Sequence, residues 1–170
     1  MSKPTRAILV VAMLLILQAC GFHLRGHDAF VLPVQTLYVQ SPNDLTPFII
    51  ELKRVLQDNN VQLSDTAEQA QLTLQIVSEK TDKQILSLSS AGRVLEYRLQ
   101  YRVSLRAYDS NQHEWLAPEE ITLGRVFSYD DTRILAKEQE ENLLYLDMRN
   151  DAVQQVLRRL NRARAPQPGQ

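Results

Sequence analysis

Apolar and polar side chains alternate without interruption over thirteen residues near the middle of the chain, 95–107. The apolar or aromatic positions begin at Leu95 and end at Ala107, and every position between two of them is polar. A period of two residues places the apolar side chains on one face of a β-strand and the polar side chains on the other. The pattern therefore predicts a long strand with one buried face.

Shorter segments of similar character flank this strand. Residues 72–76 alternate, and an apolar pattern resumes at 83–89 after a polar stretch, 79–82, that we expect to break the strand. Small and polar residues at 89–92 and 109–112 predict turns at the two ends of the long strand. The other predicted strands are 34–40, 61–64 and 120–128.

Two further segments carry apolar residues at helical spacing. Thr46 and Pro47 have the character of an N-cap and a first helical residue, and a helix is expected to follow them. A long C-terminal helix is expected after 129–132, whose acidic residues suit the positive end of the helix dipole. Its predicted apolar stripe consists of Leu143, Leu146, Val153, Val156, Leu157 and Leu160. Helices and a sheet that each have one apolar face predict an α+β fold, a two-layer sandwich.

The chain begins with a segment typical of a secretory signal, which we assign to residues 1–19. Lys3 and Arg6 precede an uncharged, mostly apolar run over 7–17, and a basic start followed by a short apolar run is the pattern of such signals. The run has eleven residues, whereas a helix needs about 20 to span a bilayer.

Cys20, the only cysteine in the sequence, directly follows Ala19. This arrangement resembles the lipobox of bacterial lipoproteins, in which the cysteine thiolate accepts a diacylglyceryl group. We expect no cofactor other than this covalent lipid on Cys20. The alternatives are an ordinary secretory signal beside a chance cysteine, or a short membrane anchor. The next residue after Cys20 is Gly21. An Asp at this position would resemble the inner-membrane retention signal of enteric lipoproteins. Its absence implies transfer to the outer membrane and a chain that faces the periplasm.

The predicted organisation is a lipidated N-terminus and tether, 20–33, a single domain, 34–162, and a disordered tail, 163–170. Loss of Lys3 and Arg6 with the signal changes the formal net charge from −1 to −3, so the charge gives no reason to expect a nucleic-acid partner. One cysteine excludes a disulfide within the mature chain.

No catalytic motif is found, and we expect that the protein is not an enzyme. His23 and His27 are four residues apart, but no third ligand lies near them, so no metal site is predicted. Arg98, Arg102 and Arg106 recur on the polar face of the long strand, about 13 Å apart. Guanidinium groups bind phosphates in bidentate fashion, so this row is either a solvated face or a surface for an anionic head group or an acidic partner.

Several short segments, in this order, resemble the LptE family of LPS-assembly lipoproteins. They are the mature start 20–25, Ala91-Gly92 followed by Glu96-Tyr97, the run 125–130, the run 135–140 and the C-terminal helix 153–160.

The resemblance implies two helices on a mainly antiparallel four-stranded sheet. It also implies a role: such lipoproteins sit in the lumen of the outer-membrane β-barrel LptD, help it to assemble, plug it, and bind lipopolysaccharide on its way to the cell surface. Basic residues near a hairpin tip and near the start of the last helix are implicated in lipopolysaccharide contact. Lys137 matches the helix position. Ser90 replaces the basic residue before the turn, and Arg93, just after it, is the expected substitute.

Two other functions remain open at this stage. The chain could be a periplasm-facing adaptor lipoprotein of another envelope or transport complex, with no lipopolysaccharide contact and no LptD partner. An envelope hydrolase is the third alternative, and a turnover lost on changing a histidine or a carboxylate would support it.

Overall fold

The computed structural model describes residues 34–164, so the predicted signal, Cys20, the tether and most of the tail lie outside the described residues. Two short 3-10 turns, Ala67–Gln69 and Asp131–Arg133, occur between the main elements. In chain order these elements are β1 (Thr36–Gln40), α2 (Pro47–Asp58), β2 (Gln62–Leu63), β3 (Leu72–Leu88), β4 (Val94–Asp109), β5 (Glu114–Ser128) and α3 (Ile134–Arg162).

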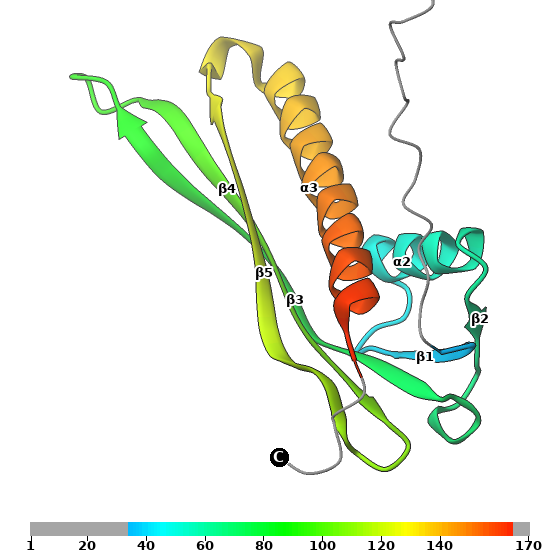
Figure 1. Cartoon of the computed structure of the whole chain (residues 1–170). Helices are drawn as coiled ribbons and strands as arrows, with labels where there is room; N and C mark the ends of the chain where they lie inside the picture. Colours follow the sequence, from blue (N-terminus) through cyan, green and yellow to red (C-terminus); the bar gives the residue numbers. More distant parts are fainter. Residues whose placement is uncertain (1–33, 165–170) are drawn as a thin grey trace, which may run out of the picture.

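The fold is the predicted two-layer α+β sandwich, with both helices on one face of a single sheet (Figure 1). The strand order is β2-β1-β3-β4-β5. β1 is parallel to β2 and β3, whereas β3, β4 and β5 form an antiparallel meander of long strands. The sheet has five strands where four were expected, because the two residues of β2 extend it beyond β1.

The strand predicted at 95–107 is confirmed as the centre of β4. Its side chains from Leu99 to Ala107 alternate between buried and half-buried, and the buried ones belong to the core shared with both helices. The pattern fails only near the β3–β4 turn, where Leu95 is 47% exposed. We call this end of the molecule the distal end. At this end the β3–β4 hairpin projects beyond the helices (Figure 1).

The predicted break at Glu79–Asp82 is wrong, because β3 runs unbroken through it. The four residues there are exposed or half-buried, so they can be polar on both faces without interrupting the strand. Irregularities in the pairing with β4 occur instead between Ile76 and Ser78 and between Ile85 and Ser87. β3 thus becomes a 17-residue strand that carries the hairpin outward.

β5 begins at Glu114, six residues earlier than the predicted 120. The turn before it is confirmed: the Asp109 carboxylate accepts the backbone N–H groups of Asn111 and His113 at 2.8 and 2.9 Å. The early part of β5 escaped prediction because its pairing is irregular opposite Leu105–Tyr108 and because it contains Pro118, which is unusual within a strand.

α2 begins as predicted. The Thr46 hydroxyl accepts the Ile49 backbone N–H at 3.3 Å, and Pro47 is the first helical residue. Proline is favoured at this position because its missing N–H would have no partner in the helix. The buried face of α2 consists of Phe48, Ile49, Leu52 and Leu56.

α3 follows the predicted acidic segment, but through an intermediate turn. Asp130 caps the 3-10 turn Asp131–Arg133, and α3 continues from it at Ile134. The predicted stripe is correct from Val153 onward and wrong before it, since Leu143 and Leu146 are 64% and 45% exposed. α2 lies beside only the C-terminal half of α3 (Figure 1). The N-terminal half of α3, which carries Leu143 and Leu146, is therefore not covered by α2. Met148 and Ala152 are the buried residues that the prediction missed.

Among the described residues, no helix is long and apolar enough to cross a membrane.

Candidate functional site

The predicted arginines of β4 lie on the face of the sheet opposite the helices, because the alternate residues of β4 fill the core. Arg98 is exposed, while Arg102 and Arg106 are half-buried among neighbouring side chains. Arg106 is held in place: its Nε donates to Gln75 Oε1 at 2.5 Å, and its guanidinium lies 5.1 Å from the centre of the Tyr108 ring. The row is therefore partly built into the outer face.

A fourth basic residue joins this row. Lys80 of β3 pairs directly with Arg102 across the strands, and like charges directly opposite one another destabilise a sheet. The prediction missed Lys80 because it placed a strand break there. Lys80, Arg98, Arg102 and Arg106 are called the outer basic row below.

Acidic residues on the same face are engaged locally. Glu96 accepts the Ser87 hydroxyl at 2.7 Å, and Glu120 accepts the Thr122 hydroxyl at 3.1 Å. Asp82 accepts the Gln84 amide at 2.8 Å. None of these bonds involves a member of the outer basic row, so its charges are available to an anion.

Arg93 and Lys137, the other two predicted contacts, lie toward the distal end of the molecule on separate elements. Arg93 follows the turn at Gly92, which has a φ of 75°, and its side chain is exposed. Lys137 lies in the first turns of α3 with only 11% of its side chain exposed. Its Nζ donates to Glu140 at 2.7 Å and to Ser128 at 3.4 Å. Lys137 is thus already paired, whereas Arg93 is open.

The structure does not gather the five predicted residues into one site. Two lie toward the distal end, and three lie along the outer face of β4. A phosphate-rich ligand that touched all of them would have to extend from the hairpin tip along the sheet.

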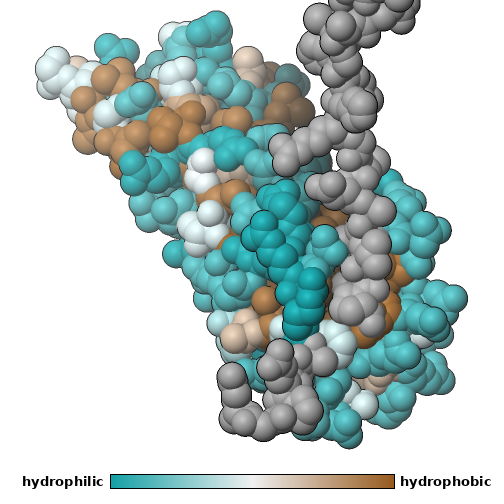
Figure 2. Space-filling view, viewed as in Figure 1, coloured by the Kyte–Doolittle hydropathy of each residue, from teal (hydrophilic) through white to brown (hydrophobic). Residues whose placement is uncertain are grey.

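The distal end is also the part of the molecule where apolar side chains gather at the surface. Figure 2 shows this hydrophobic patch where the hairpin projects. We call it the distal apolar surface: Ile85, Leu86, Leu88, Leu95, Val126, Ile134 and Leu135, each at least 40% exposed. Apolar clusters of this kind mark sites for apolar partners or ligands. The sequence showed apolar residues there, but the missing helix cover is a tertiary property.

Between the sheet and α3, Lys83 occupies an aromatic cage. Its Nζ lies 4.3 Å from the centre of the Tyr97 ring and within 6 Å of the Phe127 and Tyr129 rings. The same Nζ donates to Glu141 of α3 at 2.5 Å. The cage joins β3, β4 and β5 to the N-terminal half of α3, and its cation is already satisfied.

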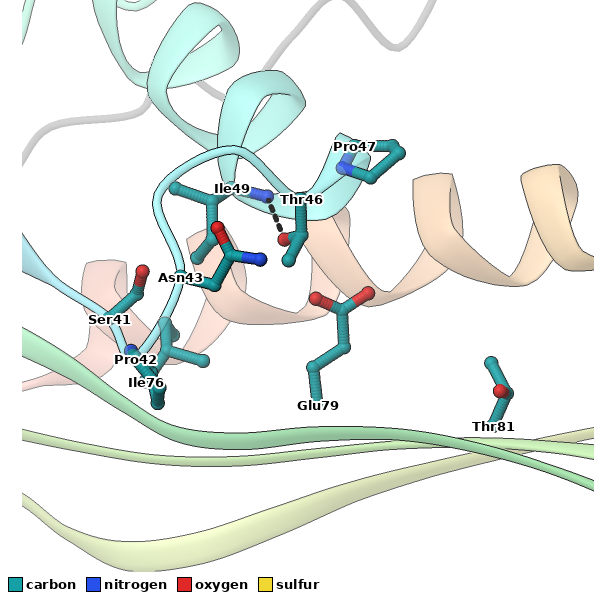
Figure 3. Close-up of a pocket in the computed structure, with 9 residues that line it drawn as sticks. All are labelled: Ser41, Pro42, Asn43, Thr46, Pro47, Ile49, Ile76, Glu79 and Thr81. Carbon is teal, nitrogen blue, oxygen red and sulfur yellow. Dashed lines mark hydrogen bonds between the residues drawn. The ribbon is translucent and has the colours of Figure 1, made fainter.

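A cavity of about 310 Å³ opens between the first turn of α2 and the middle of β3 (Figure 3). Glu79 points from β3 toward that turn, and its carboxylate accepts the Tyr101 hydroxyl at 2.6 Å. Burial raises the pKa of Tyr101, and the bond to Glu79 adds to that shift. The Ser41 hydroxyl, also in the lining, donates to Asp44 at 2.8 Å.

Two other predictions concern histidine and metal chemistry. His113 lies at the β4–β5 turn with Nδ1 3.2 Å from Asp109, whereas His23 and His27 lie outside the described residues. Within 34–164, no group of three or more potential metal ligands is found.

The comparisons with known proteins agree with one another. The family model LptE, lipopolysaccharide-assembly, matches residues 34–160. The LPS-assembly lipoprotein LptE of Pectobacterium atrosepticum is 29% identical over 147 residues, which cover 86% of this chain and 79% of that protein. The protein of the same name from Yersinia pestis is 28% identical over 154 residues, covering 90% of this chain and 73% of that one.

Solved structures show the same fold. An uncharacterized lipoprotein B from Nitrosomonas europaea has a TM-score of 0.71 and 39% identity, with 83% of this chain and 90% of that chain covered. The rare lipoprotein B from Shewanella oneidensis has a TM-score of 0.65 and 27% identity, with 72% and 91% covered. These matches confirm the resemblance found in the sequence and agree with a protein that is not an enzyme. The chain therefore belongs to the LptE family, whose role is lipopolysaccharide assembly at the outer membrane.

Proposed function

We propose that this protein is the lipid-anchored subunit of an outer-membrane lipopolysaccharide translocon. In this proposal Cys20 carries the acyl anchor, and the folded domain faces the periplasm inside the lumen of an LptD-type β-barrel. There it helps the barrel to assemble, plugs it, and binds lipopolysaccharide during its delivery to the cell surface.

The distribution of polar and apolar surface supports the position inside a barrel lumen. Within residues 34–164, no helix covers one face of the sheet, and this face is mostly polar and holds the outer basic row. The interior of a large outer-membrane barrel is polar as well, so a compact domain with such a face suits a lumen. An acyl anchor would keep this domain near the barrel and raise its effective concentration there.

The lipopolysaccharide contact follows from the chemistry of the distal end. Lipopolysaccharide combines phosphates with acyl chains, and the distal end combines Arg93 and Lys137 with the distal apolar surface. Arg93 is open to a phosphate, whereas Lys137 would have to exchange its bond to Glu140 for one to the ligand. The arginines at 98, 102 and 106 would provide further phosphate contacts along β4.

The partner is tested by purifying the tagged full-length protein from detergent-solubilised outer membranes and identifying co-purified proteins by mass. A one-to-one complex with a large β-barrel is expected. Recovery of only periplasmic or inner-membrane proteins would overturn the plug role and favour an adaptor of another envelope complex.

The lipopolysaccharide site is tested with the double variant Arg93→Glu and Lys137→Glu. We expect it to weaken binding of purified lipopolysaccharide. Because Lys137→Glu replaces an ion pair with Glu140 by two like charges, the unfolding temperature should fall somewhat, and circular dichroism checks that the domain is folded at the temperature of the binding assay. The matched control is Arg158→Glu with Arg162→Glu, the same change of charge at two exposed positions near the end of α3. Equal binding by the two double variants would overturn the site assignment without affecting the plug role.

A further inference from the structure

β5 is an edge strand of unusual length. It pairs with β4 on one side, and no strand among the described residues pairs with its other side over the 15 residues from Glu114 to Ser128. An unpaired edge presents a row of backbone N–H and C=O groups that another chain can bind.

The register with β4 identifies the outward groups. Tyr129 N donates to Leu95 O at 2.8 Å, in line with the pairing of Phe127 with Tyr97 and of Arg125 with Leu99. In an antiparallel ladder the hydrogen-bonded pairs alternate, so the odd residues of this part of β5 bond to β4. The outward backbone groups therefore belong to Glu120, Thr122, Gly124, Val126 and Ser128.

The bond made by the Gly124 carbonyl agrees with this assignment. Gly124 O accepts Arg125 Nη1 at 3.2 Å, which requires that the carbonyl faces the free edge. This is a long bond from a neighbouring side chain, and an incoming backbone N–H could replace it.

The two halves of β5 differ in protection. The half before Glu120 contains Pro118, a carboxylate at Glu114 and irregular pairing with β4. Prolines, charges and bulges are the devices that proteins use to block an edge. The half 122–128 has none of them on its outward residues, which are small or uncharged and all exposed.

The opposite free edge, on β3 beyond its short pairing with β1, offers a contrast. It has irregularities after Ile76 and after Ile85, and it carries Lys80 and Lys83. Edge protection is thus present on β3 and on the first half of β5, and it is missing where β5 lies alongside α3.

Gly124 gives independent support. Its backbone is not in the left-handed region, and an added Cβ would meet Leu99 O at 3.6 Å, an ordinary contact. Neither the backbone nor internal packing therefore requires glycine, which weakens a strand interior. Glycine at such a position is typical of a place where another backbone approaches closely.

The charge beside this edge indicates what would bind. On the helix side, Arg125 contacts both Asp147 and Asp151 of α3, at 2.8 and 2.5 Å. Two carboxylates share one guanidinium, and they keep 58% and 49% of their side chains exposed. The ledge between β5 and α3 therefore carries a net negative charge that attracts a Lys or Arg on an added strand.

We propose that residues 122–128 of β5 bind an extended segment of a partner polypeptide, which continues the sheet by backbone hydrogen bonds. The bound segment carries a basic side chain on its helix-facing side and small or apolar side chains on the other. A second copy of this chain fits poorly, because pairing β5 with β5 would bring two negatively charged ledges together. The inference rests on the proposed function only in naming the partner, the outer-membrane β-barrel.

The test uses the tagged full-length lipoprotein in outer membranes. Val126→Pro deletes an outward N–H and leaves the bonds to β4 in place, and Val126→Ala keeps that N–H as the matched control. We expect Val126→Pro to retain roughly tenfold less of the barrel than Val126→Ala, since a hydrogen bond and the register after it are lost. Thermal unfolding of both variants checks that the domain is folded.

A second measurement does not depend on proline. A photoreactive amino acid is placed at Thr122, in the unprotected half, or at Glu114, in the protected half of the same strand. Crosslinking at Thr122 only, to a partner segment that contains Lys or Arg, is the expected result.

Each failure has a distinct signature. Wild-type capture of the barrel, with equal capture by Val126→Pro and no crosslink at Thr122, would overturn the strand-addition inference alone. A Thr122 crosslink to an identified protein that is not a barrel would overturn the proposed partner while supporting strand addition. A crosslink only between two copies of this chain, or none in a strain that contains the barrel, would refute the inference.

Discussion

The aromatic cage around Lys83 should control how firmly the N-terminal half of α3 is held to the sheet. Before Met148 no residue of α3 is fully buried, and Leu144 and Tyr145 are only half-buried against the core, so the contacts of Lys83 contribute a substantial part of the attachment there. Lys83→Gln deletes the cation while leaving a side chain of similar length. We expect this change to destabilise the attachment of α3 rather than the core beneath it.

The magnitude follows from two contacts. A partly exposed cation over an aromatic ring contributes about 0.5–1 kcal/mol, and the ion pair with Glu141 about 0.2–1 kcal/mol. Lys83 and Glu141 keep 34% and 20% of their side chains exposed, so a total of about 1–2 kcal/mol is expected. For a domain of this size the unfolding temperature should fall by roughly 3–8 °C.

Hydrogen exchange separates local from global effects. In Lys83→Gln the amides of residues 138–145 should exchange roughly 5- to 30-fold faster, while those from Met148 to Leu160 change less. The matched control is Lys80→Gln, three residues earlier on the opposite face of β3, which should leave exchange in α3 unchanged. An equal rise in exchange along the whole helix, or the same effect from Lys80→Gln, would refute this prediction.

Three other outcomes are expected. Leu160→Ala should cost about 2–5 kcal/mol of unfolding free energy because Leu160 is fully buried, whereas Leu143→Ala should change it by less than about 0.5 kcal/mol; urea titration would reveal any reversal of this order. Gly92→Ala should lower the unfolding free energy by about 1–2 kcal/mol through backbone strain alone, since the φ of Gly92 is 75° and no atom lies within 4 Å of the added Cβ. An unchanged urea midpoint would contradict this. Hydrogen bonds from Thr132 and Arg133 lower the pKa of Asp130 to about 2 from a usual 3.8, so its contribution to stability is present above pH 4 and lost as the pH falls toward 2. Asp130→Ala should therefore flatten the pH profile of stability in this range. Parallel profiles of the variant and the wild type would refute the assignment.

The sequence predicts β4 and α2 well for a physical reason. A strand buried on one face by helices must alternate, and β4 does so from Leu99 to Ala107. The start of α2 depends on a local cap, Thr46 followed by Pro47, which needs no tertiary partner. Where neighbours within the element determine the structure, the pattern is sufficient.

The errors occur where burial depends on distant elements. Leu146 lies two turns before Val153 on the same flank of α3, but only Val153 is buried, because α2 covers that flank no further. Ile85 and Leu88 in the distal half of β3 are exposed as well, because the hairpin projects beyond the helices. No local signal tells how far one helix extends over another.

The candidate site divides in the same way. The arginine row of β4 follows from alternation alone, and the structure places all three of its residues on the outer face. Lys80 belongs to that row because β3 is continuous and pairs it with Arg102, and the predicted break concealed this. The pairing of Lys137 with Glu140 could be anticipated from their spacing on a helix, whereas its burial against Ser128 could not.

The position of α3 at the end of the domain has a consequence for the order in which the chain can fold. The hairpins β3–β4 and β4–β5 join neighbouring segments, so they can form as soon as Ser128 has been synthesised. α2, which is made earlier, packs Phe48 against Tyr101 but covers only one end of their inner face. The rest of that face stays open to water until the last 29-residue helix arrives. Until that moment the growing protein is an incomplete sheet with an exposed apolar face, the form of a chain most prone to aggregate. A holding chaperone would therefore act most usefully on the nascent chain before Arg162 is added, and truncation within α3 should yield insoluble protein rather than a shorter domain.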